Sequence, residues 1–360
     1  MSYFQTNIET IARVEPHPNG DVIEIAYLEG KEFTFVPRKG SFVAGDKAFH
    51  IMVDSLVPAD ILALIGLEGK LSGVAKNRVK TLTLRGVMSQ GILVPLDVLF
   101  NSTYGPTLRA VQEAGSNDYT TALGITKYEA PEIPCHTANL VALPAGLSKY
   151  DIESAQVFPE VLTRLLDIPV SITEKLEGSN YSATLFEDQS LKVNQRMHSI
   201  QPIEGAVHDF WKITDDLGIP DKLKAIQAAY YPNQQITFYG EFIGPGYQSN
   251  IYKLAHKTVR FFEIKVNGKF LDEEILMKLA IEFAIPLVPN LSRNTTLREW
   301  LAGRTLIEAS NGPSVLNPKH LREGIVIRPL KEEWIKTERN PFMRLILKQR
   351  DPVYLAKTGN

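Results

Sequence analysis

The stretch Thr173–Asn180, which reads TEKLEGSN, decides how the rest of this chain is interpreted. It ends the apolar predicted strand VSIT and continues into a turn that contains Gly178 and Ser179. A lysine at the end of a strand, here Lys175, can lie at the floor of a cleft. There, partial desolvation and neighbouring cations free its amine for nucleophilic attack. The pattern K-x-x-G is short, however, and by itself it also fits a solvated lysine in a turn.

The composition is that of a folded protein with sizeable cores. The chain has 360 residues, of which 44% are apolar and 22% are charged, so we expect two domains. The formal net charge of −2 gives no overall attraction to nucleic acid or membranes, so any basic binding surface has to be local. Cys135 is the only cysteine, which excludes an intrachain disulfide and a cysteine-based zinc site. We assign it an inert packing role.

The expected location is the cytoplasm, or the host cytoplasm if a phage encodes the protein. A single cysteine fits a reducing compartment. The N-terminal residues MSYFQTNIETIARVEP lack the basic and apolar regions of a secretion signal. The sequence also has no apolar run near the roughly 20 residues of a membrane-spanning helix, so we expect no membrane partner.

Residues 1–102 are predicted to form a small all-β barrel. Segments such as IETIARVEPH, DVIEIAYLEG and KEFTFVPRKG are rich in β-branched and aromatic residues and are separated by turn residues. Only LVPADILALIG, residues 56–66, has the character of a helix. Several short strands with one short helix are typical of small barrels. Residues 103–150, which include EAPEIPCH and LPAGLS, are interpreted as a connector rich in Pro, Gly and Ser.

Residues 151–360 are predicted to form an α+β domain. Apolar residues recur at helical spacing between Val157 and Leu166 and again between Ile275 and Phe283, with Asp272 as a candidate N-cap. Strands are expected at YSATLFE, SLKVNQR, QITFYGEFIG, TVRFFEIKVNG, EGIVIRPL and RLILKQR. These strands should pair largely as hairpins, with the helices packed outside them.

Sequences downstream of Lys175 follow the order of a known set of motifs. KLEG resembles motif I of the covalent nucleotidyltransferase superfamily, which contains ATP-dependent RNA and DNA ligases and mRNA capping enzymes. The other resembling sequences are QRMH with Arg196 (motif Ia), GEFIG with Glu241 (motif III), RFFEI with Phe262 (motif IIIa), EGIVI with Glu323 (motif IV) and LILKQR with Lys348 and Arg350 (motif V). Any one of these motifs is weak, but the ordered set is specific.

The finer resemblance is to RNA ligases. Glu174 precedes the lysine and Asn180 follows it by five residues, which are the offsets that nick-sealing RNA ligases of the phage type use for the adenine amino group and a ribose hydroxyl. NRVKTLTLRGVMSQGILVPL, LGITKYEAP and LSKYDIESAQ resemble RNA ligases of the Deinococcus and Naegleria type, which carry an OB module in front. The implied fold is an α+β nucleotidyltransferase (ATP-grasp-like ligase) domain preceded by a small all-β OB-type barrel.

The resemblance also implies roles for single residues. Lys175 would form a covalent lysyl-AMP from ATP, and Glu241 and Glu323 would hold Mg²⁺ or Mn²⁺ near the triphosphate. Lys348 would stabilise charge at the α-phosphate. Arg350 stands where a second lysine is usual, and it is not equivalent to lysine in geometry. The residues expected to contact the nucleotide are Glu174, Lys175, Asn180, Arg196, Glu241, Phe262, Glu323 and Lys348.

Simpler interpretations remain open for each residue. Glu241 and Glu323 also fit strand carboxylates that face water, and Lys348 fits a surface lysine. Phe262 fits a core residue, although Phe261 beside it has the opposite strand facing, so that one of the two should pack inward and the other face the cleft. His198 receives no role.

The densest basic cluster of the first half contains Arg78, Lys80 and Arg85. It fits either a solvated face or the surface on which an OB-type module tracks phosphates. Arg196 is the expected nucleic-acid contact in the second half, near the phosphate of a nick.

Taken together, the sequence predicts an ATP-dependent RNA ligase that works as a monomer on RNA 5′-phosphate and 3′-hydroxyl ends, at nicks in duplexes, in RNA repair. A DNA ligase or a GTP-using capping enzyme is a close alternative. Both carry a further OB domain beyond motif V, and the ten residues after Arg350 leave no room for one. A non-catalytic nucleic-acid-binding protein on a ligase fold is the alternative from another class. The intact set Lys175, Glu241, Glu323 and Lys348 argues against it.

Overall fold

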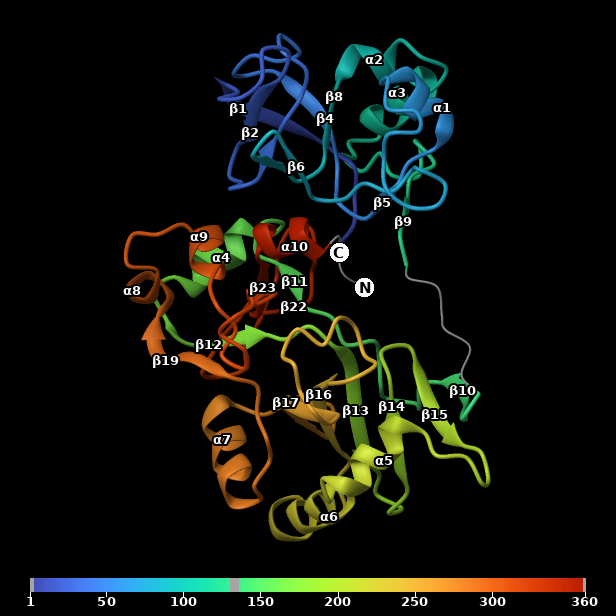
Figure 1. The fold of residues 1–360 in the computed structure, drawn as a ribbon, viewed down its shortest axis with the longest axis vertical. Coiled ribbons are helices and arrows are strands. Elements are labelled where there is room, and N and C mark those ends of the chain that lie inside the picture. Colours follow the sequence, from blue (N-terminus) through green and yellow to red (C-terminus); the bar gives the residue numbers. More distant parts are fainter. Residues whose placement is uncertain (1–2, 130–135, 359–360) are drawn as a thin grey trace. The chain divides into compact units, whose positions relative to one another are not determined.

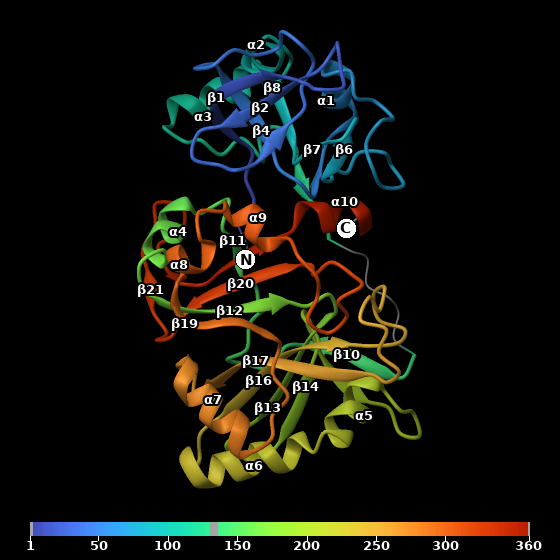
Figure 2. The ribbon, with the colours of Figure 1, turned by 60° about the vertical axis from the view of Figure 1, so that its left-hand side comes forward.

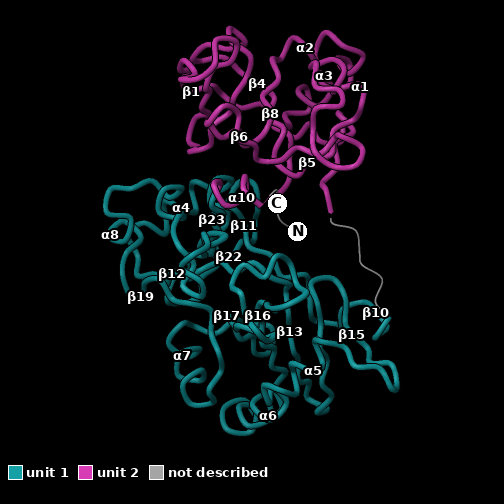
Figure 3. Tube along the Cα trace, in the orientation of Figure 1, with its two compact units in different colours: residues 1, 132–351 teal, residues 2–131, 352–360 magenta. Residues whose placement is uncertain are grey.

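The computed structural model describes residues 3–129 and 136–358. The chain divides into two compact units (Figure 3). The N-terminal unit comprises Ser2–Pro131 together with Pro352–Asn360, and the larger unit comprises Glu132–Asp351 with Met1. Cys135, to which the sequence assigned a packing role, lies outside the described residues. Within the described residues, no helix is long and apolar enough to cross a membrane.

The N-terminal unit is built on a curled five-stranded antiparallel sheet (Figure 1). Its strand order is β3 (Thr34–Phe35), β2 (Glu24–Leu28), β1 (Asn7–Pro16), β4 (Lys47–Ile51) and β8 (Ile92–Pro95). The ten-residue strand β1 pairs with β4 through its first residues and with β2 through the rest, and a bulge between Ile11 and Arg13 bends it. Gln90 N–H, just before β8, donates to Thr34 O at 2.9 Å, so the sheet curls back on its own edge. This is the predicted OB-type barrel.

The prediction that residues 103–150 form a separate connector is wrong. The first part of it folds into the N-terminal unit, where Leu108 of α3 (Gly105–Glu113), Tyr119 and Leu123 are buried in the core beside the expected helix α1 (Ala59–Leu64) and α2 (Leu96–Phe100). The last part supplies β10 (Ala138–Ala142), an edge strand of the larger unit. Among the described residues of this stretch, Gly105 and Pro106 begin α3, and Gly115, Gly124 and Gly146 lie in turns between packed elements.

The predicted boundaries at 102 and 150 are therefore replaced by a single boundary at 131, and a further division falls after residue 351. The first unit extends to residue 131 instead of 102, and the segment after residue 351, with α10 (Pro352–Thr358), groups with the N-terminal unit instead of the ligase-like domain. The remaining strands of the N-terminal unit are two short pairs: β5 (Ser55–Leu56) with β9 (Thr126–Lys127), and β6 (Leu82–Leu84) with β7 (Val87–Ser89).

The larger unit contains two sheets (Figures 1 and 2). The seven-stranded sheet has the order β10, β15 (His198–Pro202), β14 (Leu191–Asn194), β13 (Ser179–Leu185), β16 (Ile236–Ile243), β17 (Thr258–Val266) and β18 (Lys269–Phe270). The five-stranded sheet has the order β11 (Glu153–Ser154), β23 (Leu347–Arg350), β20 (Gly324–Pro329), β12 (Pro169–Lys175) and β19 (Asn290–Thr296). A hairpin of β21 (Trp334–Ile335) and β22 (Met343–Arg344) adds a further pair.

Helices cover one face of the seven-stranded sheet. Helices α5 (Asp209–Asp216), α6 (Ile219–Tyr230) and α7 (Glu273–Glu282) lie on the same side of this sheet (Figure 2). Their residues Phe210, Leu223 and Leu276 are buried in one core with side chains of β13, β16 and β17. Helices α4 (Pro159–Leu165) and α7 match the two predicted helices. Two further short helices are α8 (Leu297–Leu301) and α9 (Leu306–Ser310). Asp272 stands at the N-cap of α7, but its carboxylate accepts Glu332 N–H at 2.7 Å instead of capping the helix.

Buried ion pairs join the two sheets of the larger unit. Glu263 on β17 pairs with Arg344 on β22 and, at 3.7 Å, with Arg328 on β20. Arg328 also pairs with Glu273 of α7. All four side chains are almost fully buried, so each charge depends on its partners for stabilisation. The pairs hold the five-stranded sheet against the face of the seven-stranded sheet that the helices do not cover.

The predicted basic cluster of the N-terminal unit does not form one exposed surface. Nε and Nη2 of Arg78 donate to Oδ1 of Asp54 at 3.1 and 2.5 Å, and the guanidinium lies 3.6 Å from the ring centroid of Tyr128. Arg78 is therefore a packing residue, and this corrects its place in the cluster. Arg85 is exposed in the β6–β7 turn, and Lys80 is partly buried.

Arg78→Ala should destabilise the N-terminal unit. The change leaves Asp54 without its partner and removes the contact with Tyr128, which we expect to lower the free energy of unfolding by about 1–3 kcal/mol. Lys47→Ala, at an exposed position of β4, is the control and should change it by less than about 0.5 kcal/mol. Urea unfolding of the full chain measures both. Equal stabilities for the two variants would contradict the packing role of Arg78.

Candidate active site

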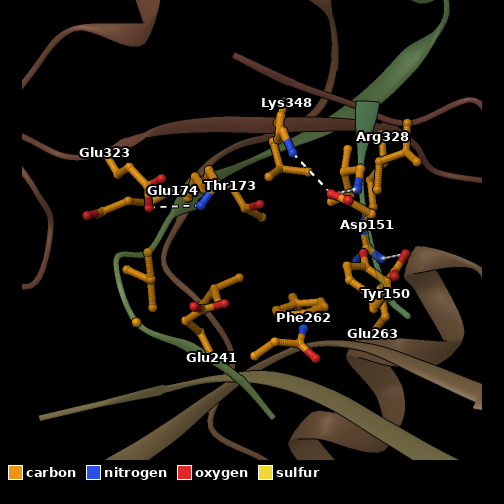
Figure 4. Close-up of a pocket in the computed structure, with 18 of the residues that line it drawn as sticks. Tyr150, Asp151, Thr173, Glu174, Glu241, Phe262, Glu263, Glu323, Arg328 and Lys348 are labelled. Atoms are coloured by element: carbon orange, nitrogen blue, oxygen red, sulfur yellow. Dashed lines mark hydrogen bonds and ion pairs between the residues drawn. The ribbon is translucent and has the colours of Figure 1, made fainter. Parts of the chain in front are cut away.

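A cavity of about 350 Å³ lies between the two sheets of the larger unit (Figure 4). The fold brings together in its lining all nine residues that the sequence predicted in this unit: Glu174, Lys175, Asn180, Arg196, Glu241, Phe262, Glu323, Lys348 and Arg350. They come from segments up to 176 residues apart, from 174 to 350. The lining also includes residues that the sequence did not single out, among them Tyr150, Asp151, Glu263 and Arg328.

Lys175 stands at the end of β12 and meets a carboxylate from the neighbouring strand. Its Nζ donates to Oε2 of Glu323 at 2.8 Å, and Arg350 Nε lies 3.1 Å from the other oxygen, Oε1. The strand register explains this meeting, because Gly324 pairs with Lys175 on one side and with Arg350 on the other. Gly324 is required there: a Cβ would lie 2.2 Å from Gln349 O.

Glu323 is held as an ionised carboxylate. Burial alone would raise its pKa, but Lys175 and Arg350 outweigh burial, so the pKa of Glu323 lies below its ordinary value. The residue before it, Arg322, donates to the carbonyls of Ala309, Ser310 and Asn311 at the end of α9. This buried arginine fixes the backbone from which Glu323 reaches the cavity.

Glu241 lies on β16, opposite Asn180 of β13 in the strand register. Burial raises its pKa to about 7, the neighbouring charge of Glu323 adds to the rise, and the positive charge of Lys175 opposes it. The cavity therefore holds Glu323, whose carboxyl group ionises readily, and Glu241, whose carboxyl group ionises near neutral pH. Such a pair is typical of sites that bind cations or transfer protons.

The turn after Lys175 explains the glycine of K-x-x-G. A Cβ on Gly178 would lie 2.5 Å from Phe242 O, so only glycine lets the turn run this close to β16. Glu177, which the sequence analysis missed, anchors the same turn: its Oε1 accepts Ser249 N–H at 2.9 Å, and its own N–H donates to the Tyr252 hydroxyl. The available signal was its place two residues after the predicted catalytic lysine, inside the motif KLEG.

Lys348 and Arg196 share one carboxylate. Lys348 Nζ lies 3.2 Å from Oδ1 of Asp151, and Arg196 Nη2 lies 2.9 Å from Oδ2 (Figure 4 shows Asp151 beside Lys348). Burial lowers the pKa of Lys348, and Asp151 opposes that shift. Asp151 lies in LSKYDIESAQ, which resembles RNA ligases, but the sequence analysis assigned this residue no role.

Phe262 faces the cavity, whereas Phe261 is fully buried in the core, as the strand alternation predicted. Its ring centroid lies 5.1 Å from that of Tyr150. Val288, Val326 and Ile346 also line the cavity. The cavity thus has an apolar and aromatic part next to its charged part, which suits a molecule with a base at one end and phosphates at the other.

Glu174 is 1% exposed, and its Oε2 accepts Val315 N–H at 2.8 Å. Burial raises its pKa, against the opposing effects of Ser314 and Val315. The carboxyl group therefore anchors the 314–315 segment. Its predicted contact with an adenine amino group stays a prediction.

The donor set for a divalent metal is small. Among the described residues there is no group of three or more His, Cys, Asp or Glu side chains arranged to hold a metal ion. Glu323 contacts Lys175 at 2.8 Å, and Glu241 lines the same cavity, where the charge of Lys175 acts on it. Magnesium is commonly bound by one or two carboxylates with water and substrate phosphates, so this pair fits such an ion.

A strand-end lysine paired with a carboxylate, flanked by further cations and next to an aromatic wall, defines the site of a covalent nucleotidyltransferase. Comparison with family models identifies the family. A model described as RNA ligase matches residues 168–348, which is half of the chain, and a model described as an OB-fold domain matches residues 5–96. The chain belongs to the RNA ligase family and carries an N-terminal OB-fold domain, as the sequence predicted.

Solved structures agree with this assignment. RNA ligase of Naegleria gruberi with PPi is 25% identical, with a TM-score of 0.75 over 99% of this chain and 98% of that chain. A lysine-to-alanine variant of that ligase with ATP and Mn (98% of both chains) and a glutamate-to-alanine variant with AMP and Mn (99% of both) are each 24% identical, with TM-scores of 0.76. These two matches show the shared fold. A search of curated proteins finds no match.

Glu241 and Glu323 should affect stability with different dependence on pH. The pKa of Glu241 is raised from 4.5 to about 7, so between these pH values the folded protein keeps a proton that the unfolded chain releases. The free energy of unfolding of the wild type therefore falls as the pH rises from about 4.5 to about 7. Glutamine cannot ionise, so the stability of Glu241→Gln minus that of the wild type should be larger at about pH 8 than at about pH 5. The pKa of Glu323 is lowered, so Glu323→Gln should be less stable than the wild type at both pH values.

Urea unfolding at the two pH values, with a chelator and without nucleotide, measures both differences. A difference for Glu241→Gln that does not change with pH would contradict the raised pKa of Glu241.

Proposed function

We propose that this member of the RNA ligase family uses ATP and a divalent metal to seal RNA ends through a covalent lysyl-AMP. The observation that carries the proposal is the contact of Lys175 with Glu323 in a cavity that also holds Lys348, Arg350 and Arg196. A nucleophile on an anionic phosphorus needs cations around the reacting centre, and this cavity has them.

In the first step, Lys175 Nζ attacks the α-phosphorus of ATP. The P–N bond forms as the bond to the β-phosphate oxygen breaks, and pyrophosphate leaves. Lys175 gives up its proton, for which Glu323 Oε2 at 2.8 Å is an acceptor within hydrogen-bond distance. Lys348 and Arg350 face the charge that builds up on the phosphate oxygens.

In the second step, a 5′-phosphate of the polynucleotide attacks the AMP phosphorus, and the bond to Lys175 breaks. In the third, a 3′-hydroxyl attacks the activated 5′-phosphate, and AMP leaves with the electrons of the broken bond. Arg196, whose side chain is 51% exposed at the cavity, is suited to the incoming 5′-phosphate because it reaches both solvent and the site.

Glu241 and Glu323 would hold the metal, which supplies charge neutralisation on the phosphates when it is bound. Phe262 would stack against the base, and Asn180 would contact the ribose. We further propose nicked duplexes as the substrate, RNA repair as the role, and a cytoplasmic monomer as the working form.

Lys175→Ala should abolish joining that starts from ATP. It should still seal a 5′ end that is chemically adenylylated beforehand, because the last step needs no lysine nucleophile. Lys192→Ala, in β14 outside the cavity lining, is the matched control and should behave as the wild type. Product formation on both substrates in a denaturing gel gives the result. Wild-type joining by Lys175→Ala from ATP would refute the assignment, and use of GTP alone would favour a capping enzyme.

Lys80 and Arg85 of the N-terminal unit should matter for binding polynucleotide and not for the ATP step. The double variant Lys80→Gln/Arg85→Gln should bind a nicked duplex more weakly, and the salt dependence of binding should flatten by about one counterion for each phosphate that the variant no longer neutralises. Labelling of Lys175 by ATP should stay near the wild-type rate, since the nine predicted cavity residues all lie in the larger unit. If labelling and sealing fall together, this module serves the ATP step instead.

A further inference from the structure

Asp151 joins the two sheets that form the cavity. Its Oδ1 lies 3.2 Å from Lys348 on β23 of the five-stranded sheet, and its Oδ2 lies 2.9 Å from Arg196. Arg196 stands in the turn between β14 and β15 of the seven-stranded sheet. One carboxylate of a side chain that is 13% exposed thus bridges the two cations on which the proposed phosphate contacts depend.

The backbone holds Asp151 from both sides. The ring of Tyr150, just before it, packs at 5.1 Å from Tyr239 and Phe262 of the seven-stranded sheet. Just after it, β11 pairs in parallel with β23, and Ala155 N–H donates to Lys348 O at 2.9 Å. Oδ1 also accepts Ile152 N–H at 3.1 Å. These contacts fix the position of the Asp151 carboxylate. The positions of Lys348 and Arg196 are therefore set by the carboxylate that they contact.

The need for such a carboxylate follows from the charges around it. The cavity lining includes Lys175, Arg196, Lys348 and Arg350. Glu323 serves Lys175 and Arg350. Without Asp151, Lys348 and Arg196 would have no counter-charge and would repel each other. The half-exposed Arg196 would then turn toward water, where a charged group is better solvated.

We propose that Asp151 is a positioning residue for phosphoryl transfer: it keeps Lys348 and Arg196 together and aimed at the place of the reacting phosphate. This inference rests on the proposed function. A phosphate that binds the two cations has to share them with Asp151, so the carboxylate orders the cations without adding to the affinity for ATP. Asp151 therefore contributes to the rate of covalent AMP formation and not to the affinity for ATP.

The test compares Asp151→Asn, which keeps the shape and removes the charge, with the wild type. At saturating ATP and magnesium, the rate constant for covalent AMP formation should fall about 10- to 100-fold, as expected when a reacting group is misplaced. The dissociation constant for ATP should not rise. It is measured by calorimetry in a Lys175→Ala background, where no adduct forms. Asp151→Glu, which keeps a carboxylate, should lose less rate than Asp151→Asn.

Asp167→Asn is the matched control. Asp167 forms an exposed ion pair with Arg298 at 2.6 Å, with side chains 65% and 63% exposed, so its loss should leave the rate and the affinity unchanged.

Three results would overturn the inference: a wild-type rate for Asp151→Asn, a rise in the ATP dissociation constant that accounts for the loss of rate, or equal losses for Asp151→Asn and Asp151→Glu. A wild-type protein that forms no AMP adduct would refute the proposed function itself, and this inference with it. The two failures are therefore distinguishable.

Discussion

The site depends on one carboxylate at the meeting point of three strands. Glu323 takes Lys175 from β12 on one oxygen and Arg350 from β23 on the other, at 2.8 and 3.1 Å. Because both partners are cations, burial does not neutralise Glu323, and its pKa stays below the ordinary value. Gly324 lets the strands come this close, and Arg322 fixes the backbone just before it. Without this carboxylate, two partly buried positive charges would lie close together with no counter-charge between them.

A second group of charges consists of Asp151 with Lys348 and Arg196. Glu241 differs from both of these carboxylates, because its pKa is raised to about 7. The cavity thus separates three functions by environment. In the proposed mechanism, Glu323 would hold the nucleophile and Asp151 the cations that contact phosphate, while Glu241 changes charge near neutral pH. Buried ion pairs at the cavity, from Glu263 to Arg344 and Arg328, hold the two sheets together beside these groups. Reaction at a phosphate depends on such preorganised charge more than on any single group.

The sequence predicted the fold class and nine residues of the cavity lining, because the motifs that contain them follow a known order along the chain. Lys175, Glu241, Phe262, Glu323 and Lys348 all line one cavity as expected. What failed depends on long-range packing. Arg78 looked like a surface cation, but Asp54 and Tyr128, which cover it, lie 24 and 50 residues away. Asp151 lies in the quoted stretch LSKYDIESAQ, but its role could not be predicted, because its partners are 45 and 197 residues distant. The domain boundaries were misplaced for a related reason: Pro and Gly mark turns inside packed units as readily as they mark linkers.

The central claim is that Lys175 carries the nucleotide, and mapping the covalent adduct tests it most directly. The wild-type protein is incubated with ATP and magnesium, denatured and digested at a pH that preserves the acid-labile P–N bond, and its peptides are analysed by mass spectrometry. The account predicts one adenylylated peptide, modified at Lys175 of TEKLEGSN. An adduct on Lys348 or on any other residue, or no adduct on a protein that nevertheless joins RNA, would contradict it.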